Sequence, residues 1–127
     1  MDYIAIKASL EKIGSSLTLF SQTQADQLKT DYNAPEDFIS FLLNVGFGRI
    51  GAGALQIYDG FVYVDEIFGY STAESENILL IGDDYQGNCI GYNPEDWSVV
   101  EVSSDMLVLK IAGSFSEYFL KVVNAVN

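Results

Sequence analysis

The chain has 127 residues, 49% of them hydrophobic, and its 18 Asp and Glu against 6 Lys and Arg give a net charge of −12. This length and apolar content fit one folded domain with a single core and argue against a disordered chain. So acidic a protein repels nucleic acid and anionic membranes, and we expect it to bind neither directly.

The residues that are missing exclude several kinds of chemistry. There is no histidine, and Cys89 is the single cysteine. An internal disulfide, a Cys-His nucleophile and a Cys/His zinc site are therefore ruled out, and Cys89 is expected to be a small core residue. The opening MDYIAIKASLEKIG lacks the features of a signal peptide, and no apolar run reaches the roughly 18 to 20 residues that span a bilayer. We expect a cytoplasmic protein without a cofactor.

Two helical segments open the chain. Residues 3–13 and 23–32 are rich in good helix formers, and Thr23 is the expected cap of the second segment. The apolar residues of the first segment are Ile4, Leu10 and Ile13. The second segment has few apolar residues and therefore only a narrow apolar face.

The clearest helical pattern is NAPEDFISFLLNVGFG, residues 33–48. Pro35 stands in its first turn after a cap at Asn33 or Ala34, and two acids follow at the positive end of the helix dipole. Gly46 is expected to end the helix. One buried face is predicted for Phe38, Phe41, Leu42 and Val45.

From Gly51 onward, short apolar runs alternate with Gly, Asn and Asp, a pattern typical of antiparallel strands. Asp59-Gly60 is interpreted as a turn, and a short helix in part of VYVDEIF is the alternative to a strand there. The expected strand runs are ALQIY, FVYVDEIF, ILLIG, CIGY, SVVEV and MLVLKI.

The segment SFSEYFLKVVNAV near the end of the chain predicts a last helix, with Ser114 as N-cap and Glu117 at the capping-box position. Its expected apolar face holds Phe115, Tyr118, Phe119, Val122 and Val126. The order of helices, sheet and final helix predicts one α+β domain over residues 1–127, with an antiparallel β-sheet packed against the N-terminal helices and the C-terminal helix.

The acidic residues are concentrated in one window. Between Ile50 and Leu109 there are eleven acids and no Lys or Arg, while the other 67 residues hold seven acids and six bases. Such a surface would speed the approach of a basic partner by long-range steering. The alternative is that this charge only keeps the protein in solution.

The segment ILLIGDDYQGNCIGY, residues 78–92, predicts a β-hairpin whose bend is allowed by Gly82 and Gly87. Tyr85 on this bend is a candidate for an exposed contact. No register of the segment brings together the oxygen ligands, the glycine and the final glutamate of an EF-hand. Cation binding would need an irregular site, and we expect no metal.

The segment GFGRIG, residues 46–51, matches the dinucleotide-binding pattern G-x-G-x-x-G. That pattern works only after a strand and at the start of a helix, whereas this segment follows a predicted helix and leads into a strand. We interpret it as a flexible connection between the helices and the sheet.

Adjacent acids at 65–66, 83–84 and 95–96 raise the alternative of a carboxylate-based hydrolase. Neighbours on an extended strand point to opposite faces, so adjacency alone does not make a catalytic pair. Without histidine, nucleophile elbow or phosphate loop, we expect no catalytic residue and no enzymatic activity. Trp97, after the last pair, is interpreted as a core aromatic in preference to an interface anchor.

Three segments together resemble one family. APEDFISFLLNVGFG is similar to the proline-led helix and glycine turn of the SUKH superfamily, the SMI/KNR type of bacterial toxin-immunity proteins. ILLIGDDYQGNCIGYNPED resembles its strand, IG-D-x-x-G turn and following strand, and IAGSFSEYFLKVV resembles its C-terminal helix. The resemblance covers about residues 33–125, and the chain departs from it in having no tryptophan in the first helices and a short, base-free middle. The matching residues are Pro35, Phe38, Gly46, Ile81, Gly82, Asp83, Gly87, Ser114, Phe115 and Leu120.

The resemblance implies helices packed on an antiparallel sheet and the intracellular binding of a cognate polymorphic toxin, with nucleases prominent among such toxins. A nuclease holds phosphates with Lys and Arg, so an acidic protein can occlude its basic groove without catalysis. We expect a monomer or a weak dimer. The alternatives left open are a regulatory scaffold that binds a host protein and the carboxylate hydrolase. The expected partner-binding residues are Asp65, Glu66, Asp83, Asp84, Tyr85, Glu95 and Asp96.

Overall fold

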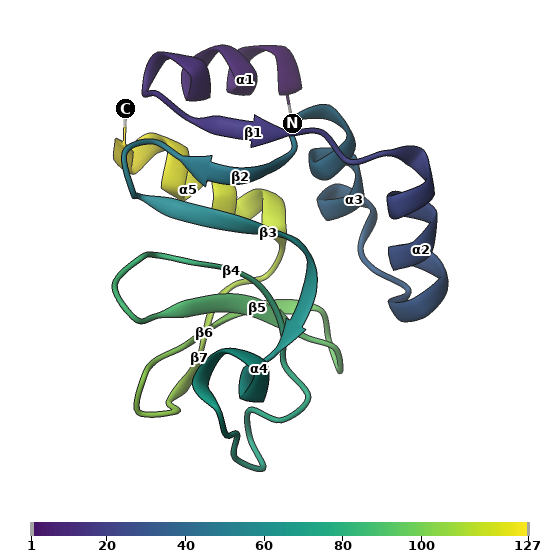
Figure 1. The fold of residues 1–127 in the computed structure, drawn as a ribbon, viewed down its shortest axis with the longest axis vertical. Coiled ribbons are helices and arrows are strands. Elements are labelled where there is room, and N and C mark those ends of the chain that lie inside the picture. Colours follow the sequence, from purple (N-terminus) through teal and green to yellow (C-terminus); the bar gives the residue numbers. More distant parts are fainter. Residues whose placement is uncertain (1, 127) are drawn as a thin grey trace.

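A computed structural model describes the backbone of residues 2–126 and the side chains of residues 2–125. Its seven strands form one antiparallel sheet in which each strand pairs with the next along the chain (Figure 1). The expected α+β fold, with helices from both ends of the chain and an antiparallel sheet, is confirmed. The strands are β1 (Ser16–Thr18), β2 (Phe47–Ile50), β3 (Leu55–Tyr63), β4 (Leu79–Asp83), β5 (Cys89–Asn93), β6 (Ser98–Val102) and β7 (Val108–Ala112).

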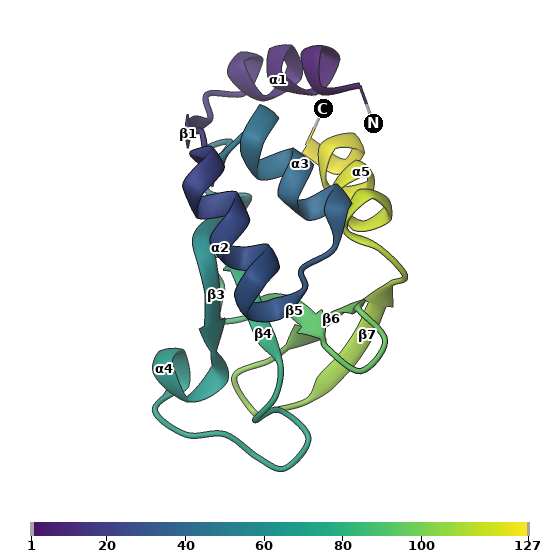
Figure 2. The same cartoon turned by 90° about the vertical axis from the view of Figure 1, so that its right-hand side faces the viewer.

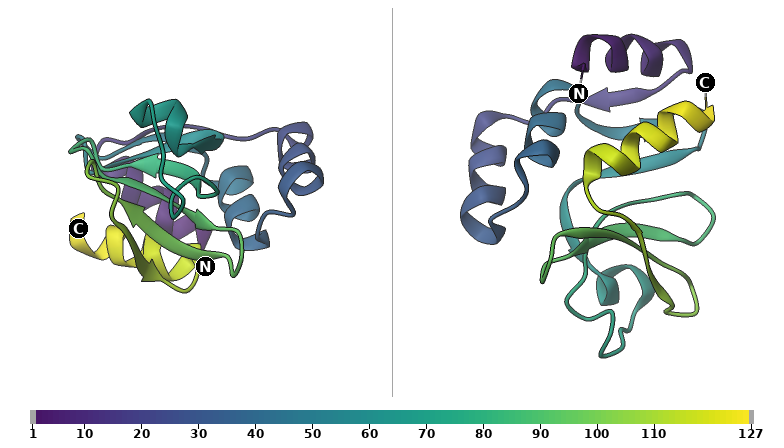
Figure 3. Two further views of the ribbon diagram at one scale, coloured as in Figure 1. Left: turned by 90° about the horizontal axis from the view of Figure 1, so that it is seen from below. Right: turned by 180° about the vertical axis from the view of Figure 1, so that it is seen from behind.

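The helices cover the two faces of the sheet unequally. Four of them share one core with the sheet, whereas the short α4 packs on the opposite face, at the far end of the molecule from α1 (Figures 1 and 2). Figure 3 shows the sheet between α4 and α5 when the molecule is seen from below. The helices are α1 (Tyr3–Lys12), α2 (Gln22–Tyr32), α3 (Glu36–Asn44), α4 (Val64–Phe68) and α5 (Phe115–Val126).

The larger core is centred on aromatic contacts between α3 and α5. The ring centroids of Phe41 and Phe119 lie 4.6 Å apart, those of Phe41 and Phe115 4.9 Å, and those of Phe38 and Phe115 5.0 Å. Each such side chain stabilises the fold by about 1.5–3 kcal/mol when fully buried. The N-terminal and C-terminal helices are therefore held together against the sheet by the same apolar contacts.

A smaller core lies on the other face, where Val64 of α4 meets side chains of β4, β5 and β6. Because β4 and β5 are buried on both faces, their apolar runs are continuous and do not alternate with polar residues. Cys89 belongs to this core and is 3% exposed, so its expected role as a small core residue is confirmed.

Local capping sets where two of the helices begin. The hydroxyl of Ser114 accepts a hydrogen bond from the N–H of Glu117 at 3.2 Å, as the sequence predicts. The predicted cap of α2 at Thr23 is wrong. Ser21 caps this helix instead, because Ser21 and Gln24 hydrogen-bond to each other's backbone N–H at 3.1 and 2.9 Å and satisfy both groups.

The terminal helices each bury one face. In α1, Ile6 and Leu10 are buried, whereas the apolar side chain of Ile4 is 86% exposed. In α5, Phe115 and Phe119 are buried, with Tyr118 and Val122 packed partly against them. The predicted contact of Val126 lies outside the described side chains.

The predicted flexible connection at residues 46–51 is wrong, because residues 47–50 form β2 and pair with β1. A Cβ atom at Gly46 would lie 2.3 Å from the carbonyl oxygen of Thr18, and one at Gly48 would lie 2.3 Å from that of Ser16. The glycines of GFGRIG therefore allow β1 to approach β2, and they have no phosphate-binding geometry at a helix start.

The predicted turn at Asp59-Gly60 is also wrong, since both residues lie inside β3. The strand accommodates them by a register shift against β4 between Ile57 and Val62. The short helix allowed in VYVDEIF is present as α4 and follows β3 directly.

The predicted hairpin of β4 and β5 is present, but its two glycines have different roles. Gly87 adopts φ +93° in the turn, as a bend requires. Gly82 is part of β4, where a Cβ would lie 2.1 Å from the backbone oxygen of Gln56 in β3. Gly82 thus allows close strand pairing and not a bend. Trp97 is half-buried against the larger core, with its ring 5.4 Å from that of Tyr92.

Candidate functional site

The structure divides the seven predicted partner-binding residues between opposite ends of the sheet. Because successive strands alternate in direction, the β4–β5 turn lies at one end and the β3–β4 and β5–β6 connections lie at the other. We call residues 83–88 the hairpin end, and α4 with residues 69–78 and 93–97 the groove end. Strands of five residues separate the two ends by about 16 Å. The seven residues therefore do not form one continuous patch.

At the hairpin end, Asp83 is engaged inside the protein. Its carboxylate accepts hydrogen bonds from the hydroxyl of Tyr58 at 2.7 Å and from the N–H of Tyr85 at 2.9 Å. Burial and the bond to Asp83 raise the pKa of Tyr58 far above its ordinary value, and Cys89 Sγ lies 4.0 Å from the same hydroxyl. Asp83 thus fixes the start of the turn and the phenol beneath it.

Asp84 closes the same turn. Its Oδ1 accepts from the N–H groups of Gln86 at 2.8 Å and Asn88 at 3.1 Å, and its Oδ2 accepts from the Asn88 side chain at 2.9 Å. Partial burial raises the pKa of Asp84, but these hydrogen bonds more than offset that effect and hold the pKa below its ordinary value. A basic partner that binds either acid of the hairpin end would therefore compete with hydrogen bonds inside the protein for the carboxylate oxygens.

Tyr85 at the tip of the hairpin is 48% exposed, with φ +62°. It borders an open hollow of about 750 Å³ together with Arg49, whose guanidinium donates to the carbonyl oxygens of Gly51 at 3.0 Å and Gly14 at 2.9 Å. Tyr85 is accessible, as expected, but a positive charge already lies at this end of the sheet.

The groove end carries the other four predicted residues. Glu66 accepts from the N–H of Tyr63 at 2.7 Å, and Asp96 accepts from the N–H and the hydroxyl of Ser98 at 2.9 and 2.7 Å. The hydroxyl and N–H of Ser98 hold the pKa of Asp96 below its ordinary value. By contrast, the carboxylates of Asp65 and Glu95 have no hydrogen bond or ion pair with any other described residue. These two are exposed and free to meet a partner.

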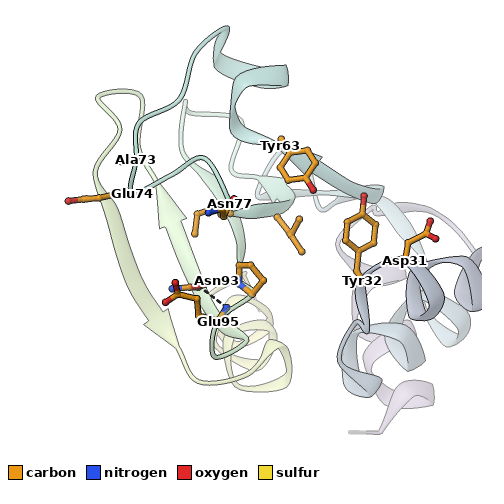
Figure 4. Close-up of a pocket in the computed structure, with 11 residues that line it drawn as sticks. Asp31, Tyr32, Tyr63, Ala73, Glu74, Asn77, Asn93 and Glu95 are labelled. Atoms are coloured by element: carbon orange, nitrogen blue, oxygen red, sulfur yellow. Dashed lines mark hydrogen bonds between the residues drawn. The ribbon is translucent and has the colours of Figure 1, made fainter.

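A groove of about 630 Å³ opens at this end, between the C-terminal end of α2 and the connections that flank β3, β4 and β5 (Figure 4). In Figure 4, Tyr32 and Tyr63 stand side by side on one wall, and Asn93 and Glu95 stand on the other. Ile78 and Leu79 provide buried apolar surface between these walls. The lining residues are Asp31, Tyr32, Tyr63, Ala73, Glu74, Asn77, Ile78, Leu79, Asn93, Pro94 and Glu95.

The charged side chains that line the groove are all acids: Asp31, Glu74 and Glu95. Burial raises the pKa of Tyr32, and so do the neighbouring Tyr63, Asp31 and Glu66. The negative end of the α2 dipole adds to this field, because α2 ends at Tyr32 on the groove wall. The closest base along α2, Lys29, is already paired with Glu36 at 2.6 Å. A cation is therefore the ligand that this groove favours.

Sequence reasoning found only Glu95 among the groove residues, with Asp65, Glu66 and Asp96 beside the groove. Tyr32 and Tyr63 were missed because they lie on different elements, at the end of α2 and the end of β3. One weak signal was available in the acids and tyrosines at positions 31–32, 63–66 and 70–76, which recur near the ends of predicted elements.

The described residues contain no group of three or more Cys, Asp and Glu side chains that could hold a metal ion. The closest approach to a reactive cluster is Tyr58 with Asp83 and Cys89, but both the phenol and the thiol are protonated at neutral pH, since burial raises the pKa of each. The acids and tyrosines of the groove end suit binding of positively charged groups that can pack on aromatic rings.

Over residues 2–126, no helix is both long and apolar enough to cross a membrane. Comparison with protein-family models and with curated proteins gives no match for this chain.

Proposed function

We propose that this protein is a cytoplasmic immunity protein, which binds a basic cognate toxin through the groove end and neutralises it by occlusion. One observation carries the proposal: the base-free, acidic window between Ile50 and Leu109 folds so that exposed acids and exposed aromatic and aliphatic side chains share one end of the sheet. Asp65 and Glu95 supply free carboxylates there. Beside them, Tyr63, Ile67 and Tyr70 are 41%, 46% and 53% exposed.

This mixture is what a protein interface needs. Aromatic side chains supply contact area at its centre, while charges at its rim raise the association rate and discriminate against wrong partners. A toxin that acts on nucleic acid presents Lys and Arg to phosphates, and a carboxylate surface competes for the same groups. Inhibition by occlusion needs no catalytic group. The sequence resemblance to SUKH immunity proteins supports the same role.

The first test measures association with the purified cognate toxin. The variant Asp65→Lys/Glu95→Lys removes two carboxylates that hold nothing inside the fold, so folding is expected to be unchanged. The matched control, Glu11→Lys/Asp59→Lys, makes the same change in net charge at exposed positions of α1 and β3. We expect the groove-end variant to slow association at low salt by about tenfold and to flatten its salt dependence, with a much smaller effect for the control. Equal effects of both variants would refute the location.

The second test asks whether binding protects cells. The toxin candidate is the product of a secreted-toxin gene adjacent to the gene for this chain, expressed alone or together with the protein. We expect growth to be restored by the native chain and by the control variant, and restored less by the groove-end variant. Binding to a harmless host protein without any rescue would contradict the immunity role and favour a regulatory scaffold.

A further inference from the structure

The groove at the groove end is more than an acidic surface, because it has two unlike walls. One wall holds the phenol rings of Tyr32 and Tyr63, and the other holds the polar side chains of Asn93 and Glu95 (Figure 4). Its volume of about 630 Å³ exceeds the size of any single side chain and matches a few residues of an extended segment. The groove therefore has room for a short piece of polypeptide.

The tyrosine wall is prepared for a flat cation. The ring of Tyr32 is held edge-to-face against Phe61, with centroids 4.9 Å apart, so it is fixed before any partner arrives. Tyr63, 41% exposed, stands beside it. A guanidinium group stacks on aromatic rings and forms paired hydrogen bonds with a carboxylate, whereas an ammonium group provides only a point charge.

Charge complementarity indicates that the ligand is positively charged. The lining residues include Asp31, Glu74 and Glu95 but neither Lys nor Arg. Asp31 lies beside Tyr32, and Glu95 lies across the groove from it (Figure 4). The C-terminal end of α2 adds its negative dipole at the same wall. A planar cation is the ligand that suits the tyrosine rings, the flanking carboxylates and the helix C-terminus together.

We propose that the groove receives an arginine side chain from an extended basic segment of the partner protein, stacked on Tyr63 and Tyr32, while Glu95 on the opposite wall attracts the neighbouring basic groups of the same segment. This rests on the proposed function only in taking the partner to be a basic protein. The arginine provides the fixed anchor, while the surrounding acids provide long-range attraction.

The test uses the whole isotope-labelled chain and a blocked peptide of alternating glycine and arginine as the probe. A lysine peptide of equal length and charge is compared at the same ionic strength, and spermine serves as a non-peptide cation. We expect the arginine peptide to shift the amide signals of Asn77, Asn93 and Glu95, and to bind at least about threefold more tightly than the lysine peptide. Equal binding of the three cations, or shifts concentrated at Tyr85 and Gln86, would overturn the proposal.

Matched variants locate the anchor. Tyr63→Ala and Glu95→Gln are each expected to weaken binding of the arginine peptide about threefold, since the first removes the stacking surface and the second removes a charge on the facing wall. Tyr85→Ala and Glu11→Gln remove the same groups elsewhere and are expected to leave the affinity unchanged. Equal losses in both pairs would refute the groove as the anchor.

The cognate toxin separates the two proposals. If the toxin binds the native chain but is unaffected by Tyr63→Ala and Glu95→Gln, the arginine anchor is wrong and the immunity role stands. If the arginine peptide binds in the groove as predicted but no toxin is neutralised, the anchor stands and the immunity role is wrong.

Discussion

The hydroxyl group of Tyr92 allows a sharp test of how the larger core is held together. The side chain of Tyr92 is fully buried on β5, and its hydroxyl has no hydrogen-bond partner among the described residues. The ring itself is well placed, with centroids 5.4 Å from Trp97, 5.8 Å from Phe38 and 6.2 Å from Phe61. Tyr92→Phe keeps these ring contacts and removes only the unpaired polar group.

The expected gain follows from the penalty of burying a hydroxyl without a partner. That penalty is about 1–3 kcal/mol, and the folded state with Phe avoids it. We expect Tyr92→Phe to raise the free energy of unfolding by about 1 kcal/mol, the low end of the range, because the protein can relax around the hydroxyl. For a chain of this size, that gain corresponds to an increase in Tm of about 3 to 5 °C.

The assay is thermal and urea unfolding followed by circular dichroism, with Tyr58→Phe as the matched control. Tyr58 donates to the Asp83 carboxylate at 2.7 Å, so the same substitution there is expected to lower the free energy of unfolding by about 1 kcal/mol. The two variants should therefore shift Tm in opposite directions. A loss of stability in Tyr92→Phe comparable to that in Tyr58→Phe would show that the buried hydroxyl is satisfied in solution and would refute the reasoning.

The remaining predictions concern pH and the β4–β5 hairpin. Burial raises the pKa of Tyr58 and of Tyr92 above the ordinary 10.0, so above pH 10 the unfolded chain loses these protons before the folded protein does, and the free energy of unfolding falls by up to about 1.4 kcal/mol per pH unit for each. Below pH 10 neither group makes stability depend on pH, and urea unfolding at increasing pH should show a smaller loss in the double Phe variant. Gly82→Ala brings a methyl group to 2.1 Å from a backbone oxygen of β3, so it should lower the free energy of unfolding by more than about 3 kcal/mol or prevent folding. Gly87→Ala has open space around the new methyl group but keeps φ +93°, so it should cost only about 1 kcal/mol. Similar losses of Tm in the two variants would contradict this contrast. Hydrogen bonds hold the pKa of Asp84 low, so the stability that its carboxylate provides is present above pH 4 and is lost as pH falls through that lowered pKa. Asp84→Ala should cost about 1 kcal/mol at pH 7, and its free energy of unfolding, followed by fluorescence, should fall less steeply below pH 4 than that of the native chain.

The two acids of the hairpin end illustrate how charge and structure compete for the same residue. Asp83 and Asp84 were natural candidates for a partner surface because they stand together at a glycine-flanked bend. In the fold, their oxygens accept hydrogen bonds from Tyr58 and from the turn itself. A carboxylate with several internal donors gives up part of its stabilisation when it contacts a partner, so the free carboxylates of Asp65 and Glu95 are better placed to supply binding energy.

Much of the fold could be predicted from local patterns. The α3 segment combines a proline-led start, acids in its first turn and apolar residues at helical spacing, and α5 combines a serine cap with an amphipathic face, so each specifies its own helix. The strand runs from Leu55 onward were visible because β-branched and aromatic residues alternate with turn residues. Local rules failed at β1 and β2, which are three and four residues long and pair across an intervening pair of helices.

The sequence by itself determined the α+β composition, the excess of negative charge and its concentration between Ile50 and Leu109, since these depend on residue identity and short-range spacing alone. Only the tertiary structure decided which acids are free and where they gather. Strand direction sent Asp83 and Glu95 to opposite ends of the sheet, and the packing of α2 brought Tyr32 beside Tyr63. The physical reason is that a binding groove is formed by residues distant in sequence, whose approach depends on the burial of the whole core and not on any local propensity.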